Sequence, residues 1–342
     1  MAYHNIRTPV FYCNMLEYLD RHGLIQHASG NSSERIYMNF QRMGLWATAG
    51  NSANNVRTVY TDIPISDWLG SKCFYAILGH NGDNAGAKVR LQYFGSGQSY
   101  QTISKSGDDL KVIVNGNISS ETNTFPYDGW SLCTFNGDDL EGNRSIISFR
   151  MDATSSSYAH DLRYGAIALG NYFEAPSTDL NVSISTEMDG IKSIRTKGGY
   201  ELTDYQYTRG QNWVYSDNYA NEIAAWELAT GENNLTRQGR RLFDISWSYL
   251  ADSDVFPELS NHFPPSGYDY DLDGQKSLLV SSTLAGILEY SMGGTIPILF
   301  QYSSDNNAPD NFALVKIDSK SVKITQQSAG LYKVNLKLRE VW

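Results

Sequence analysis

Short apolar runs, separated at regular intervals by clusters of Gly, Asn, Asp and Ser, occupy most of this 342-residue chain. Runs of this length, bounded by residues that favour turns, predict β-strands rather than helices. In the first half of the chain the predicted strands are 36–40, 56–61, 73–79, 88–94, 110–114, 130–135, 145–151 and 164–169. Because short strands at this spacing are typical of a β-sandwich or jelly roll, we expect a mainly β protein.

The N-terminal segment has a different pattern. Four apolar residues recur there at helical spacing: Phe11, Met15, Tyr18 and Leu19. A Thr-Pro pair at 8–9 can begin a helix and Gly23 can end it, so the segment predicts a short N-terminal helix. We expect three parts: a helical segment (1–29), a β-sandwich (30–176) and a second β domain with one helix (177–342).

The second β domain begins with a hairpin signal. Runs at 181–188 and 191–196 flank Asp189-Gly190, a pair that favours a two-residue hairpin turn. That register would place Glu187 opposite Lys192. Further along, apolar residues at helical spacing over 277–292 end at Gly293-Gly294 and predict a helix. The remaining predicted strands are 242–250, 296–302, 312–318 and 322–326, and 200–240 reads as a long loop.

The last strand, from Leu331 onward, shows strict alternation. Three apolar residues, Val334, Leu336 and Leu338, would lie on one face and be buried. The opposite face would carry three cations: Lys333, Lys337 and Arg339. We expect these cations to meet acidic groups at a subunit contact, where they would serve assembly.

The overall charge restricts the partners of the protein. The formal net charge is −10 and the pI is about 5.1. A nucleic-acid-binding surface normally needs a basic stripe, so we expect no specific binding to DNA. The three cysteines are widely spaced, which indicates neither a disulfide framework nor a structural zinc site. No apolar run is long enough for a transmembrane helix, and no signal peptide is expected.

Motifs that carry catalysis or bind cofactors are not recognisable, so we expect no enzyme activity and no cofactor. His80 follows an apolar strand and is expected to be a hydrogen-bonded turn residue. The one metal-like motif places Asp269, Asp271 and Asp273 at alternate positions before a glycine, as in calcium loops. Val280 stands where such loops carry a bidentate Glu, so an acidic turn without tightly bound metal is expected.

Several short motifs occur in a fixed order along residues 177–342. They are Gly198-Gly199-Tyr200, the run Gly239-Arg240-Arg241-Leu242-Phe243-Asp244, the pair Gly293-Gly294, and the closing Leu336-Lys337-Leu338-Arg339. This order resembles virion structural proteins of marine cyanophage-type tailed phages, and the region looks like the tail-tube-type fold of distal tail and tail-tip proteins. Two runs in residues 30–176 are similar to galactose-binding-like jelly rolls attached to such proteins: Ala76-Ile77-Leu78-Gly79-His80-Asn81 and Gly165-Ala166-Ile167-Ala168-Leu169-Gly170.

This resemblance implies a structural subunit of a phage tail tip or baseplate, located in the virion after assembly in the host cytoplasm. It implies a ring of copies, commonly six, around a channel through which genomic DNA passes without specific binding. The jelly roll would attach other tail or baseplate proteins.

The alternative is a carbohydrate-binding or receptor-binding tail protein at the baseplate periphery. Trp130 and Trp68 could then form a platform on which host glycans stack. Aromatic residues at this density more often build the core and the interfaces. Fibre proteins also usually carry repeats or long coiled segments, which this chain lacks.

Overall fold

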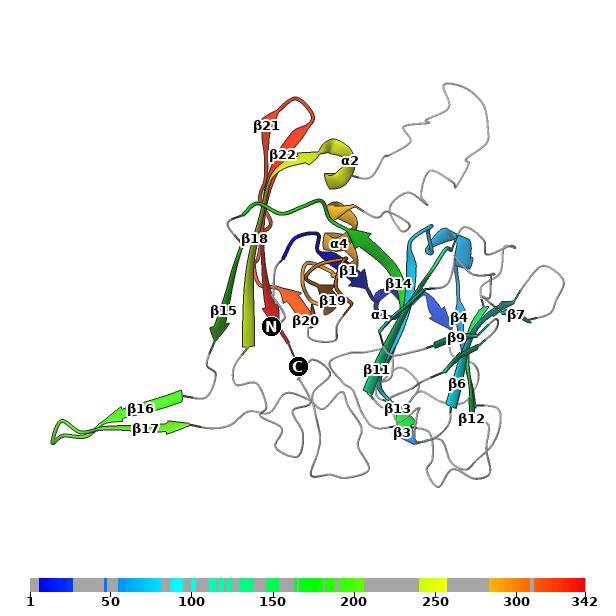
Figure 1. The fold of residues 1–342 in the computed structure, drawn as a ribbon, viewed down its shortest axis with the longest axis horizontal. Helices are drawn as coiled ribbons and strands as arrows, with labels where there is room; N and C mark the ends of the chain where they lie inside the picture. Colours follow the sequence, from blue (N-terminus) through cyan, green and yellow to red (C-terminus); the bar gives the residue numbers. More distant parts are fainter. Residues whose placement is uncertain are drawn as a thin grey trace.

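The strands of this protein build two large antiparallel sheets (Figure 1). In this computed structural model, the residues described are 6–26, 46–47, 55–80, 87–94, 100–102, 111–114, 117–119, 122–124, 129–137, 146–153, 163–164, 166–180, 182–187, 191–205, 240–256, 283–307 and 311–341. They form a mainly β fold with a few short helices, as predicted. The predicted strand 36–40 lies outside the described residues.

The larger sheet has eleven strands. Its strands in spatial order are β15 (Ser183–Glu187), β18 (Arg240–Ala251), β22 (Leu331–Glu340), β20 (Phe312–Ile317), β19 (Ile298–Gln301), β1 (Val10–Cys13), β14 (Ala166–Glu174), β5 (Cys73–His80), β11 (Gly129–Phe135) and β8 (Lys111–Val114). A further strand, β21 (Ile324–Ser328), pairs with β22. The sheet therefore contains strands from all three parts expected from the sequence.

The second large sheet has seven strands. They are β2 (Ile25–Gln26), β4 (Asn55–Thr61), β12 (Ile146–Ala153), β6 (Ala87–Phe94), β10 (Thr122–Thr124) and β9 (Asn117–Ser119), with β7 (Tyr100–Thr102) paired to β6. Two separate pairs complete the strands: β3 (Trp46–Ala47) with β13 (Arg163–Tyr164), and β16 (Ile191–Arg195) with β17 (Glu201–Tyr205). Most predicted strands within the described residues are confirmed to within two residues at each end, whereas 164–169 divides between β13 and the longer β14.

The N-terminal segment forms a strand before its helix, which corrects the prediction of a helix from residue 8. Phe11 lies in β1, where Tyr12 pairs with Tyr172 of β14 on one side and with Leu299 of β19 on the other. The helix α1 (Met15–Arg21) begins after Asn14. Gly23 follows it with a φ of 71°, a left-handed conformation that suits the predicted helix stop.

The helix predicted over 277–292 is confirmed at its C-terminal end. The described part of this helix begins at Leu284. It forms α4 (Leu284–Tyr290), whose N-cap Thr283 accepts a hydrogen bond from the backbone N–H of Gly286. Gly293 and Gly294 then take φ values of 64° and 88°, which ends the helix. Two single-turn helices, α2 (Asp252–Val255) and the 3₁₀ helix η3 (Ile65–Asp67), complete the helical elements of the described residues.

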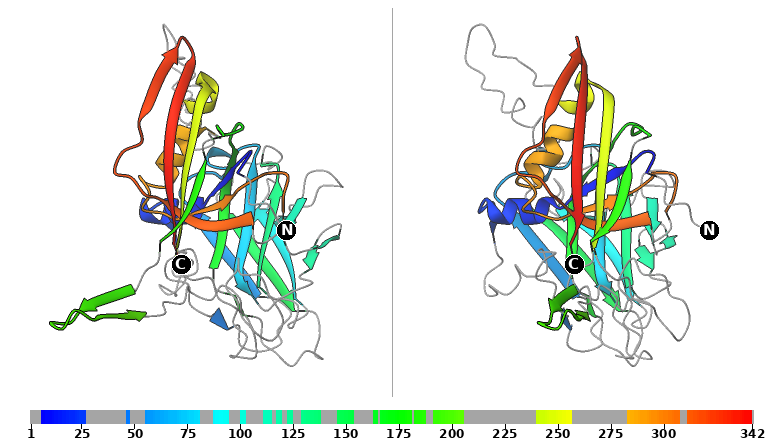
Figure 2. Two further views of the ribbon diagram at one scale, coloured as in Figure 1. Left: turned by 60° about the vertical axis from the view of Figure 1, so that its left-hand side comes forward. Right: turned by 90° about the vertical axis from the view of Figure 1, so that its left-hand side faces the viewer.

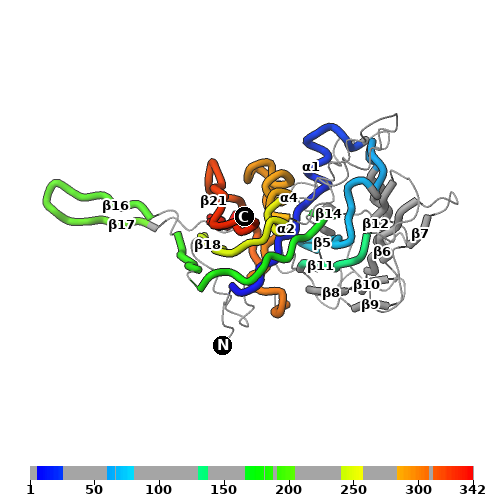
Figure 3. Tube along the Cα trace, turned by 90° about the horizontal axis from the view of Figure 1, so that it is seen from above, coloured from blue at the N-terminus to red at the C-terminus, as the bar shows by residue number. Residues whose placement is uncertain are grey.

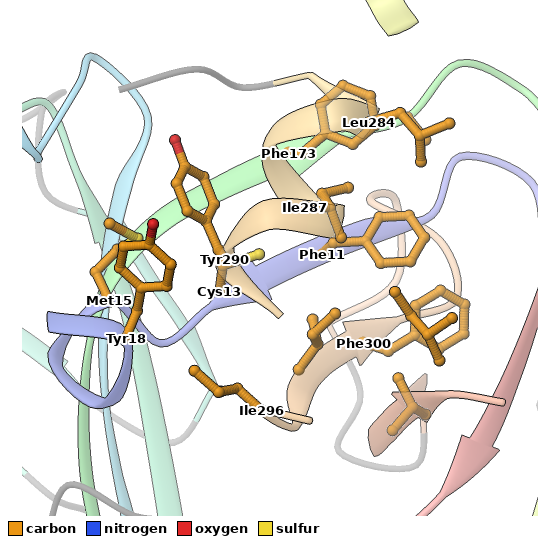
Figure 4. Packing of buried hydrophobic residues seen from close by; sticks show 14 of the residues in the cluster. Phe11, Cys13, Met15, Tyr18, Phe173, Leu284, Ile287, Tyr290, Ile296 and Phe300 are labelled. Carbon is orange, nitrogen blue, oxygen red and sulfur yellow. The ribbon is translucent and has the colours of Figure 1, made fainter. Parts of the chain in front are cut away.

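The hydrophobic core forms where β1, β19 and the two longer helices meet (Figure 4). Phe11 of β1 lies with its ring centroid 5.2 Å from that of Phe300, and Phe300 lies 5.4 Å from Phe243 of β18. Tyr18 of α1 meets Tyr290 of α4 edge to face at 5.8 Å. The N-terminal segment is therefore a central part of the core that the C-terminal strands share.

The hairpin predicted at Asp189-Gly190 is not formed by the flanking strands. β15 pairs with β18, which places Glu187 opposite Arg240. β16 pairs instead with the following strand, β17, so Lys192 lies opposite Asp204. The first residues of the predicted 200–240 loop are thus part of a strand. The turn preference of a dipeptide is local, whereas β15 gains a long partner strand in the main sheet.

Candidate assembly surface

One face of the sheet formed by β15, β18 and β22 packs on the core, and the opposite face, here called the outer face, is polar. Val334, Leu336 and Leu338 of β22 are fully buried on the inner side, as the alternation predicted. Side chains of β18 alternate in the same way, with Ile245 buried and its neighbour Asp244 partly exposed. Helices α2 and α4 lie on the inner side of these strands (Figures 1 and 3), and no helix among the described residues lies on the other side.

The three cations predicted to serve assembly lie on the outer face. Arg339 forms an ion pair with Glu187 of β15, with 2.7 Å between Nη2 and Oε2. Lys337 lies 3.8 Å from Asp244 of β18. The outer face therefore carries alternating charges across three strands. Exposed pairs of this kind add little to stability, and both Arg339 and Lys337 meet their acidic partners within the same chain.

The segment that leads into β15 is anchored to the body by Asp179. Its carboxylate accepts hydrogen bonds from the backbone N–H of Ser248 at 3.1 Å and from its hydroxyl at 2.6 Å. Partial burial disfavours the charged form, but the hydrogen bonds from Ser248 and Ser246 and the charge of Lys333 hold the pKa of Asp179 below its ordinary value. The indole N–H of Trp247 donates to the carbonyl of Pro176 at 2.9 Å.

A buried ion pair holds the ends of β18 and β22 together beneath the outer face. Arg241 donates to Glu340 through Nε at 2.9 Å and through Nη2 at 2.5 Å. The guanidinium also donates to the hydroxyl of Tyr302 and to the carbonyl of Phe312. This pair was not predicted, although Glu340 continues the inward positions of the terminal alternation, a pattern that indicates a buried acid.

Strand β15 forms one end of the eleven-stranded sheet (Figure 2). Its residues are exposed along most of its length, including Ile184, and Leu180 just before it is fully exposed. Within the part of the chain that the structure describes, β15 pairs on one side only, with β18. An edge strand of this kind can add a strand or a flat surface from another chain.

Beyond β15, the strands β16 and β17 form a hairpin, here called the hairpin arm (residues 191–205), that projects away from the body (Figures 1 and 3). Its turn is closed by a hydrogen bond from the backbone N–H of Thr196 to the carbonyl of Tyr200 at 2.8 Å and by one from the N–H of Tyr200 to the Thr196 hydroxyl at 3.1 Å, with Gly199 at a φ of 86°. The apolar side chains on the arm are largely exposed: Ile194 at 65%, Leu202 at 61% and Tyr200 at 78%. The arm was not predicted, because a strand in a core and a strand on a projecting ribbon have similar apolar content.

The two tryptophans predicted as a glycan platform are core residues in this structure. Trp68 is 0% exposed and Trp130 is 3% exposed, and the Trp130 ring meets Phe312 edge to face at 5.0 Å. Neither indole presents a ring face to solvent, and stacking on a sugar requires an open ring face. The expected platform is therefore not formed by these two residues.

Asp269, Asp271 and Asp273 lie outside the described residues. Within the residues that the structure describes, no group of three or more His, Cys, Asp and Glu residues could hold a metal ion, and no helix is long and apolar enough to cross a membrane.

His80 lies at the end of β5 and is buried, with its Nε2 2.8 Å from the hydroxyl of Ser131. Burial lowers the pKa of His80 to about 3.

Comparisons with protein-family models, with curated proteins and with solved structures find no match to this chain. The function is therefore inferred from the geometry of this surface. The surface combines an edge strand, a sheet face with alternating charges and a projecting ribbon with exposed apolar side chains. These features are typical of a surface that contacts other protein chains.

Proposed function

We propose that this protein is a structural subunit of a tailed-phage tail tip or baseplate, which assembles with copies of itself in the virion. The observation that carries the proposal is the surface of β15 and the outer face, an open sheet edge beside alternating charges. Six copies would surround the channel for DNA, as the sequence resemblance implies. The tail-tube-like domain (177–342) would form this ring, and the jelly roll (30–176) would attach neighbouring tail proteins.

The charges of the outer face suit contacts between copies of one chain. Each copy presents cations from β22 beside carboxylates of β15 and β18, so a second copy can exchange partners with them. The full chain is acidic, so a channel lined by it would not hold DNA tightly. Receptor binding by Trp130 and Trp68 is less well supported, because both side chains are buried.

Sedimentation velocity of the full chain over a range of concentrations tests self-assembly. We expect species larger than the monomer, and we expect the triple variant Lys333→Ser, Lys337→Ser, Arg339→Ser to assemble more weakly. The difference should be largest at low salt, where charge contacts are strongest. Lys320→Ser with Lys323→Ser is the matched control, because both lysines are exposed and precede β21. A wild-type monomer at every concentration would contradict self-assembly.

The place of the protein in the particle is tested by cryo-electron microscopy of the phage that contains it. We expect density for six copies around the tail axis. Threefold fibre density that contains this chain would instead support the receptor-binding alternative.

A further inference from the structure

The hairpin arm exposes apolar side chains without a core of its own. In the pairing of β16 with β17, Ile194 lies opposite Leu202. Lys192 lies opposite Asp204 on the same face of the ribbon. On the other face Arg195 lies opposite Glu201, and the hydroxyl of Ser193 donates to Glu201 and lies 3.1 Å from the hydroxyl of Thr203. A two-stranded ribbon alone is marginally stable in water, so a covering surface would stabilise the arm.

The arm of one copy does not cover the exposed apolar residues of its own body. The arm follows the C-terminal end of β15 and points away from the body, as two views at right angles show (Figures 1 and 3). Leu180 and Ile184 lie before and near the beginning of β15 and stay exposed. The molecule therefore has two separate apolar surfaces: one on the arm and one beside the sheet edge.

Charge and length both favour a second copy of this chain as the partner. Residues 191–205 hold three basic and two acidic side chains, a net charge of +1, whereas the whole chain carries −10. The rest of the chain therefore carries −11, so the arm and the remainder of the chain are opposite in sign. From residue 191 to the turn at residue 198 the arm extends about 23 Å, at roughly 3.3 Å per residue, and it projects from the body, where another copy can approach it (Figures 1 and 3).

We propose that the hairpin arm of one copy packs on the next copy, with Ile194 and Leu202 against Leu180 and Ile184 beside its β15 strand. This inference rests on the self-assembly in the proposed function and names the contact that produces it. Two different surfaces meet in such a contact, so it is heterologous, and repeated head-to-tail contacts close into a ring when the rotation allows. The arm also lies next in sequence to the edge strand that the proposed function uses.

The first experiment removes the apolar contact and leaves the body unchanged. The double variant Ile194→Ser, Leu202→Ser should raise the dissociation constant of the assembly by roughly tenfold to a hundredfold, measured by sedimentation. Circular dichroism should show an unchanged melting transition, because both side chains are exposed. The matched control is Met292→Ser, which removes an exposed apolar side chain just after α4, outside the arm and the outer face, and should leave assembly unchanged.

The second experiment tests the partner surface directly. Full-length protein with Leu202→Cys is mixed with full-length protein carrying Leu180→Cys under mild oxidation. We expect a disulfide-linked dimer that contains one of each variant, and little cross-linking when Lys320→Cys replaces Leu180→Cys. The three natural cysteines are buried and should not react.

Each outcome decides between the two proposals. If the wild type assembles but the serine variant assembles equally well and the mixed cysteine dimer does not form, the arm contact is wrong and self-assembly stands. If the wild type is monomeric at every concentration, self-assembly itself fails, and the arm contact fails with it.

Discussion

Deletion of residues 331–342 should abolish folding of the C-terminal part of the protein. Residues 331–340 of this segment form β22, an interior strand of the sheet that lies between β18 and β20. Removing it exposes an edge on each neighbour. It also removes Val334, Leu336 and Leu338, all fully buried, whose burial contributes roughly 1.5–3 kcal/mol each, or roughly 5–9 kcal/mol together.

The deletion also removes Glu340, the partner of the buried Arg241. A buried charge that loses its partner costs about 3–5 kcal/mol. The two losses together match the net stability of a typical domain, about 5–15 kcal/mol. We therefore expect the loss of the cooperative transition, rather than a shift in its midpoint.

The assay is thermal melting followed by circular dichroism, on the full chain and on the truncated chain. A matched pair of point variants in β22 separates the contribution of a buried side chain to stability from that of the strand backbone. Leu336→Ala should lower the free energy of unfolding by about 2–5 kcal/mol, and Asn335→Ala, at the next, exposed position, by less than about 0.5 kcal/mol. An unchanged cooperative transition in the truncated protein would refute the placement of β22 in the core.

Two further predictions concern buried ionisable groups. Glu340→Gln should lower the free energy of unfolding by about 3–5 kcal/mol in urea titrations, because it leaves the Arg241 cation buried without a counter-charge, and a loss below about 1 kcal/mol would contradict this. His80 should make the protein less stable in acid. Its pKa is about 3 when folded and about 6.5 when unfolded, so the unfolded chain binds the extra proton and stability falls as the pH decreases from about 6.5 toward 3. His80→Gln should flatten that part of the stability–pH curve, and parallel curves for the two proteins would show that His80 is not buried as a neutral group.

Elements with strong local signals were predicted well from the sequence. The strand at 73–79 and the terminal strand match β5 and β22, because their apolar patterns reflect the faces that are buried. The end of α4 matches because Gly293 and Gly294 take left-handed conformations that few other residues tolerate. The outward direction of Lys333, Lys337 and Arg339 follows from the same alternation.

The strand pairing was predicted less well. Asp189-Gly190 favours a local hairpin, yet β15 pairs with β18 and β16 with β17. Tertiary packing likewise changes Phe11 from the expected helix to a strand between β14 and β19. In both cases pairing with strands distant in the sequence overrides the local preference.

For this protein, the sequence by itself determined most of the longer strands, where α1 and α4 end and which side chains of the last strand are buried. Each of these depends on residues close together in the chain. Only the tertiary structure decided that Trp68 and Trp130 are buried, that Arg241 meets Glu340, and that residues 191–205 leave the body as an arm. Those outcomes depend on contacts between residues far apart in sequence, and the alternation of apolar and polar residues is the same whichever strand becomes the neighbour.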